Sequence, residues 1–134
     1  MKKILLIFFI LLFISCESNL GSKENTEPIL PNDPILIGTW VGSLGYWNSY
    51  LDTYEWHTTY IYMFKPNNLI EYSSSRREWG ILIKEYDFTY EWKIENGISY
   101  YKLYNNQFSE WKELKIEKIN NNNIIIDGIK LTKN

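Results

Sequence analysis

The 134-residue sequence has only one cysteine, Cys16, and one histidine, His57. A single cysteine excludes an internal disulfide. Because the chain has only one cysteine and one histidine, it lacks the nitrogen and sulfur ligands of a typical zinc or redox-metal site. The sequence also has no glycine-rich phosphate loop and no nucleophile elbow. We therefore expect no catalytic residue, no metal, no cofactor and no enzymatic activity.

Positive charge is scarce as well. The chain has 14 basic and 16 acidic residues, and without Lys2 and Lys3 of the N-terminal segment 12 basic residues remain against the 16 acidic ones, a net charge of about −4. Beyond that segment the only basic run is the pair Arg76-Arg77. This distribution argues against a nucleic acid or an anionic lipid surface as the partner.

Long apolar runs are limited to one, at the N-terminus. Residues 4–14 are almost entirely apolar and follow Lys2 and Lys3. The run is shorter than the roughly 20 residues that a helix needs to cross a bilayer. We therefore predict a secretory signal peptide over residues 1–15 rather than a permanent transmembrane anchor.

The stretch Leu12-Phe13-Ile14-Ser15-Cys16 resembles the lipobox of bacterial lipoproteins, with Phe13 at the position that leucine usually occupies. The resemblance implies that Cys16 receives a diacylglycerol and becomes the new N-terminus. Two or three acyl chains hold a protein stably on a membrane, whereas one does so only marginally. We expect an exported protein, anchored to the bacterial cell envelope through Cys16 and located at the outer membrane. The alternative is an ordinary cleaved signal that leaves a free thiol.

After Cys16 the composition changes twice. Residues 17–34 are rich in Ser, Asn, Glu, Thr and Pro and contain no aromatic residue. Because such a segment cannot bury enough apolar surface to offset its ordering entropy, we predict a flexible tether over residues 16–34, spanning on the order of 25 Å. Residues 35–134 hold 20 of the 23 aromatic residues and are long enough for one domain with one core.

Periodicity predicts that this domain is built from β-strands. Residues 85–95 alternate between apolar or aromatic side chains at even positions and charged residues or threonine at odd ones, the pattern of a half-buried strand. The odd-numbered carboxylates then lie on the solvated face and are poor candidates for acid/base catalysis. Asn96-Gly97 follows and predicts a two-residue hairpin, with residues 98–104 as the return strand.

The same combination of apolar alternation and turn residues predicts further strands. We expect them at residues 39–48, 55–65, 69–79, 111–119 and 124–131. A helix over residues 110–119, rich in Glu, Lys and Leu, is the alternative for one of them. The prediction is an all-β fold, an antiparallel up-and-down meander of about seven or eight strands that curls into a small β-barrel or half-barrel.

The first predicted strand carries a known signature. Leu36-Ile37-Gly38-Thr39-Trp40 resembles the G-x-W motif of lipocalins, and the layout of lipobox, polar tether and tyrosine-rich strands resembles the lipocalin-like domains of small bacterial lipoproteins over residues 35–134. The resemblance implies that Gly38 permits close packing and that Trp40 plugs the closed end of the barrel. Lys130 or Lys133 is the candidate for a basic residue stacked on that tryptophan.

Two aromatic faces are the candidate ligand site. One strand contributes Trp56, Tyr60, Tyr62 and Phe64, and another contributes Tyr86, Phe88, Tyr90 and Trp92. A tyrosine-rich interior suits a partly wet pocket, because each buried hydroxyl needs a hydrogen-bond partner. Two hypotheses remain open. The first is a carrier of a small hydrophobic ligand; the second is an envelope lipoprotein that acts structurally or through protein contacts, with a filled barrel. The sequence identifies no protein partner.

Overall fold

The computed structural model describes residues 33–134. The expected signal peptide, Cys16 and residues 17–32 of the expected tether lie outside the described residues. All regular secondary structure in the described part is β-strand, and no helix there could cross a membrane. The helix considered for residues 110–119 is therefore wrong, and the all-β prediction is confirmed.

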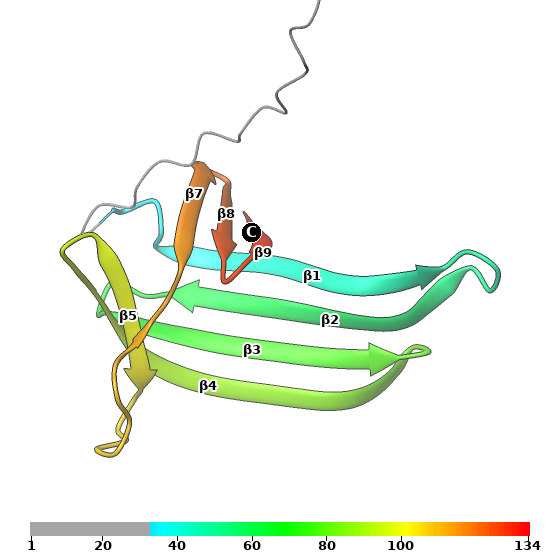
Figure 1. The fold of residues 1–134 in the computed structure, drawn as a ribbon, viewed down its shortest axis with the longest axis horizontal. Helices are drawn as coiled ribbons and strands as arrows, with labels where there is room; N and C mark the ends of the chain where they lie inside the picture. The colour runs from blue at the N-terminus through cyan, green and yellow to red at the C-terminus, as the bar shows by residue number, and fades with distance from the viewer. Residues whose placement is uncertain (1–32) are drawn as a thin grey trace, which may run out of the picture.

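Nine strands follow one another along residues 33–134. Four are long and form a curved sheet, while the others are shorter and gather at one end of it (Figure 1). Their bounds are β1 Gly38–Asn48, β2 Thr53–Phe64, β3 Leu69–Glu78, β4 Ile81–Glu95, β5 Ile98–Leu103, β6 Lys112–Glu113, β7 Ile116–Asn120, β8 Asn123–Ile126 and β9 Ile129–Lys133.

The strands make one antiparallel sheet in the order β6-β5-β4-β3-β2-β1-β9-β8-β7. The first strand pairs with the last, since Trp40 lies opposite Lys133 and Val41 opposite Thr132. The two edge strands, β6 and β7, are consecutive in the chain, and each pairs with a different neighbour, β5 and β8 respectively. The sheet is thus strongly curled, as expected for a meander that protects its edges, and forms a half-barrel.

Tight turns set the register of this sheet. Asn96 and Gly97 have φ angles of 53° and 77°, as a two-residue type I′ hairpin requires. Asp127 and Gly128, at 47° and 82°, form a second hairpin of this kind that splits the strand predicted over residues 124–131 into β8 and β9. The Asp-Gly signal for this turn lies inside an apolar run, which is why the run read as one strand. The strand predicted over 111–119 is also divided, at Leu114 and Lys115, where the chain changes partner.

The hydrophobic core lies at one end of the half-barrel. It joins the start of β1 and β3 and the ends of β2 and β4 to the short strands. Its buried members are Leu36, Trp40, Phe64, Ile70, Trp92, Leu114, Ile124, Ile126 and Leu131. At the other end, the tips of the four long strands extend past the short strands and have no second layer over them (Figure 1).

Trp40 is the centre of the covered end. It is fully buried, and its indole N–H donates to the carbonyl of Leu36 at 2.8 Å. Lys133, rather than Lys130, lies over its ring, with Nζ 5.3 Å from the centroid, and donates to the carbonyl of Ile35 at 2.8 Å. Strand β9 approaches β1 closely here, because a Cβ at Gly42 would lie 2.4 Å from the carbonyl oxygen of Lys130.

Candidate functional site

The concave face of the long strands carries the aromatic side chains. The sheet register places Tyr62 of β2 opposite Tyr72 of β3, and Tyr72 opposite Phe88 of β4. One step further from the core, Ser74 lies opposite Tyr86. Because side chains in a strand alternate between faces, these residues project to the same side of the sheet as Trp40.

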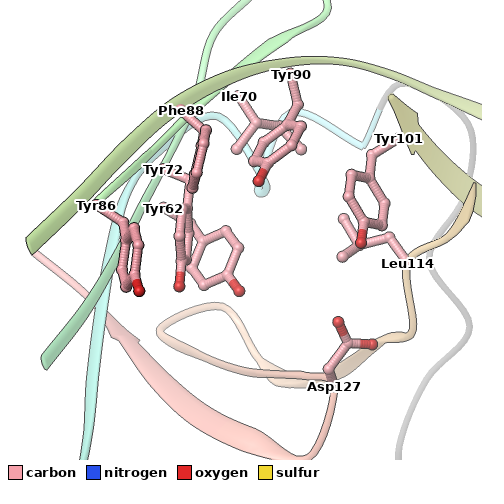
Figure 2. A pocket seen from close by; sticks show the side chains of 9 residues that line it. All are labelled: Tyr62, Ile70, Tyr72, Tyr86, Phe88, Tyr90, Tyr101, Leu114 and Asp127. Atoms are coloured by element: carbon pink, nitrogen blue, oxygen red, sulfur yellow. The ribbon is translucent and has the colours of Figure 1, made fainter. Parts of the chain in front are cut away.

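These side chains line a pocket of about 310 Å³ between the core and the open tip (Figure 2). Its volume is at the lower end of the roughly 300–1,000 Å³ range of small-molecule sites. Ile70 and Leu114 form its apolar base next to the core. The remaining lining residues are Tyr62, Tyr72, Tyr86, Phe88, Tyr90, Tyr101 and Asp127.

The rings form a continuous wall because neighbouring strands bring them into contact. Tyr62 and Tyr72 have ring centroids 4.9 Å apart, and Tyr90 meets Tyr101 of β5 edge to face at 5.1 Å. The centroid of Tyr72 lies 6.2 Å from that of Tyr90, which links the two pairs. Contacts of this kind stabilise aromatic clusters by about 0.5–1.5 kcal/mol per pair beyond area burial. Contacts among its own rings therefore stabilise the wall.

Asp127 faces this wall from the β8–β9 turn. Its side chain lies across the pocket from the hydroxyls of Tyr62 and Tyr101 (Figure 2). The turn is fixed to the β6–β7 connection by two bonds, because the backbone N–H of Asp127 donates to the carbonyl of Lys115 at 2.9 Å and the N–H of Lys115 donates to Asp127 Oδ1 at 3.2 Å. The carboxylate is therefore held in place by the backbone of another element.

Two phenols of the pocket, those of Tyr62 and Tyr90, have raised pKa values. Burial, reinforced by Tyr72 and Asp127, raises the pKa of Tyr62 far above its ordinary value. Burial and the neighbouring phenol of Tyr101 also raise the pKa of Tyr90. Both groups are neutral hydroxyls across the physiological pH range, so they can donate as well as accept hydrogen bonds.

A second pocket of about 400 Å³ adjoins the first towards the open tip. The two share Tyr72 and Tyr86 in their linings. The second is more polar, because Arg76, Glu78 and Lys84 contribute to it. Its remaining lining residues are Thr58, Tyr60, Ser74 and Ile83.

Within the polar pocket, Arg76 is already engaged. Its Nη2 lies 2.9 Å from Glu78 Oε1, and its guanidinium lies 5.4 Å from the ring centroid of Trp56. The concave face thus changes from apolar, next to the core, to charged, near the tip.

The eight predicted ligand-site residues fall into three groups. Tyr62, Tyr86, Phe88 and Tyr90 line the aromatic pocket, and Tyr60 lines the polar pocket. Trp56 lies further towards the tip, under Arg76. Phe64 and Trp92 are buried in the core, where their rings pack edge to face at 5.2 Å.

Five lining residues were not predicted. Tyr72 and Ile70 share a face of β3, and pairing β2 with β3 through the Pro66-Asn67-Asn68 turn would have placed them beside Tyr62. Leu114, Tyr101 and Asp127 lie on the short strands or their turns. Tyr101 lies on the return strand of the predicted Asn96-Gly97 hairpin, opposite Trp92, so the hairpin signal could have found it. No local pattern in the sequence shows that Leu114 and Asp127 approach the long strands.

Among residues 33–134 no group of histidine, cysteine, aspartate and glutamate side chains is arranged to hold a metal ion. Comparison of the chain with protein-family models, with curated proteins and with solved structures finds no match.

Proposed function

We propose that this chain is an exported lipoprotein, anchored in the bacterial cell envelope through Cys16, whose lipocalin-like half-barrel binds a small hydrophobic ligand on its concave face. One observation carries the proposal. The aromatic pocket remains open although six aromatic rings line it, so the barrel interior is not filled by its own side chains. An open pocket lined by this many aromatic rings is typical of a binding site.

The polarity of the pocket supports a ligand with some polar groups. Its base is apolar, whereas the hydroxyls of Tyr62, Tyr72 and Tyr86 all point to one side of the ring wall, away from Ile70 (Figure 2). A ligand bound there buries its apolar part against Ile70 and Leu114 and meets the phenols at its other end. Burial of apolar surface contributes about 25 cal/mol per Å².

A binding titration tests the proposal. The full chain in lipid vesicles is titrated with a neutral fluorescent fatty alcohol, and energy transfer from tryptophan is followed, with vesicles lacking protein as the blank. Phe88→Asn should weaken binding about fivefold, because it removes about 1 kcal/mol of apolar contact. Thr89→Asn is the matched control, since Thr89 is adjacent on β4 but lies on the convex face, opposite Glu71. Absence of saturable binding, or equal losses in both variants, would contradict the proposal.

A second candidate is supported by the open tip. There β4 pairs with β5 only through Tyr90–Glu95, and the carbonyl of Thr89 accepts from the N–H of Tyr104, so residues 81–88 form an unpaired strand edge. This edge carries exposed Ile81, Leu82 and Ile83. An unpaired apolar edge is suited to pairing with a strand of another protein. The envelope lipoprotein acting through protein contacts becomes the better proposal if the titration shows no saturable binding.

Anchoring needs its own test. Cys16→Ser should release the protein from the membrane fraction or leave it unprocessed, because the acyl chains are attached to the thiol. Fractionation and metabolic acyl labelling measure this. Unchanged membrane partition together with unchanged labelling would show that Cys16 is not the anchor.

A further inference from the structure

The polar side-chain atoms that line the aromatic pocket are all of one element. Its nine lining residues contribute five phenol hydroxyls and one carboxylate, so every polar side-chain atom in the lining is an oxygen. No lysine, arginine, histidine, asparagine or glutamine lines it. The pocket therefore offers many hydrogen-bond acceptors, and its side-chain donors are phenols alone.

The single charged lining group is negative and fixed in position. The N–H of Lys115 donates to Asp127 Oδ1 at 3.2 Å, and the N–H of Asp127 donates to the carbonyl of Lys115 at 2.9 Å. The carboxylate of Asp127 faces the ring wall from the opposite side (Figure 2). Tyr62, Tyr90 and Tyr101 lie on the wall that it faces. A positive group placed between them meets a carboxylate on one side and aromatic rings with phenol oxygens on the other.

Resting on the proposed function, we infer that the ligand is an organic amine, protonated at neutral pH, with an ammonium group on an apolar body. The ammonium N–H groups donate to Asp127 and to the phenol oxygens, and the ring faces attract the charge through cation–π interactions. The apolar body packs towards Ile70 and Leu114.

An anionic ligand fits the same pocket poorly. Asp127 repels it, and only the phenols can donate to it from the side chains that line the pocket. The cationic side chains of Arg76 and Lys84 line the neighbouring polar pocket instead. The excess of acidic residues in the chain also favours the approach of a cation at long range.

Three probes with nearly the same apolar body separate the alternatives. The full chain in lipid vesicles is titrated with phenethylamine, phenethyl alcohol and phenylpropionate, and its own tyrosine and tryptophan emission is followed. We expect the amine to bind roughly three- to tenfold more tightly than the alcohol, as expected for one partly exposed ion pair together with cation–π contact. The carboxylate should bind most weakly. Added salt should reduce the preference for the amine and leave the binding of the alcohol unchanged.

Asp127→Asn tests the role of the carboxylate. Asparagine tolerates the positive φ of 47° at this turn and can still accept the N–H of Lys115, so the variant should fold. It should abolish most of the preference for the amine over the alcohol. Asp87→Asn, on the convex face opposite Ser73, removes the same charge from the chain and should leave the preference unchanged. Equal denaturation midpoints of the two variants show that any difference between them is local.

Other outcomes overturn the inference in distinguishable ways. Equal binding of the amine and the alcohol, or tighter binding of the carboxylate, rejects an amine ligand but leaves the proposed function standing. Equal effects of Asp127→Asn and Asp87→Asn reject the assignment of the carboxylate. If neither the three probes nor the fluorescent fatty alcohol binds saturably, both the inference and the proposed function fail.

Discussion

The two ends of the half-barrel share the same strands but differ in what covers them. On β1, Trp40 is fully buried, whereas Trp47, seven residues later, has 47% of its surface exposed. On β4, Trp92 is buried, whereas Ile81 has 67% of its surface exposed. Both ends of the long strands carry large apolar side chains. The difference in burial arises because the short strands pack against only one of the two ends. Burial in this fold is decided by position along the strand as much as by its face.

The difference also separates the residues that stabilise the fold from those of the proposed ligand site. The covered end contains the packed core. Towards the open end, the aromatic rings contact one another and are not part of that core. A substitution at the covered end should therefore lower the free energy of unfolding, and one at the open end should affect mainly ligand affinity.

The largest contrast is expected between the two tryptophans of β1. Trp40→Ala should lower the free energy of unfolding by about 3–5 kcal/mol, the usual cost of truncating a buried large aromatic residue. Trp47→Ala should cost about 1 kcal/mol or less, because it loses mainly an edge-to-face contact with Tyr54 at 4.8 Å. Denaturant titration of both variants measures the difference. Equal costs would mean that the open end contributes to the core.

A smaller effect is expected where β9 closes on β1. Gly42→Ala places a Cβ 2.4 Å from a backbone oxygen and 2.5 Å from the side chain of Leu131. The strands must separate, which should cost about 1–3 kcal/mol, as overpacking usually does. Ser43→Ala, on the opposite face, should have little effect on the denaturation midpoint. A neutral Gly42→Ala would show that the first and last strands are not tightly joined.

Alkaline pH should lower the free energy of unfolding through Tyr62, because burial opposes the ionisation of its phenol. Because burial raises the pKa of Tyr62 above its ordinary value of about 10, the phenol is protonated in both the folded and the unfolded state below that pH, and stability does not depend on pH through this group there. Above it, the unfolded state releases a proton that the folded state retains, so the free energy of unfolding falls as pH rises. Tyr62→Phe should reduce this alkaline loss. Tyr50→Phe, at a residue with 98% of its surface exposed, should not. Urea titrations at neutral and alkaline pH measure both.

The smallest effect on stability is expected at the unpaired edge of β4. Leu82→Ser should change the free energy of unfolding by less than about 1 kcal/mol, since the side chain is exposed and is not a member of the buried core. Ile124→Ser, in the buried core, should cost several times more. Denaturation midpoints compare the two, and a large loss in Leu82→Ser would indicate that another element covers the edge.

Much of the fold was predictable from local signals. The alternation over residues 85–95 and the Asn96-Gly97 turn place the concave side chains of β4 correctly, because a strand of this kind can satisfy its charges in only one orientation. Three of the eight predicted ligand-site residues, Tyr86, Phe88 and Tyr90, line the aromatic pocket on this basis. Phe64 and Trp92 show the same alternation but lie under the short strands, which no local pattern reveals.

The sequence by itself determined the four long strands, the Asn96-Gly97 hairpin and the face on which their aromatic side chains project, since these depend on neighbours a few residues apart. Only the tertiary structure decided which part of that face is core and which is pocket. The reason is the approach of Leu114 and Asp127 from segments distant in sequence. It also decided that a carboxylate faces the tyrosines, because Asp127 reaches them only through the close contact of β9 with β1 and the bonds of its turn to Lys115.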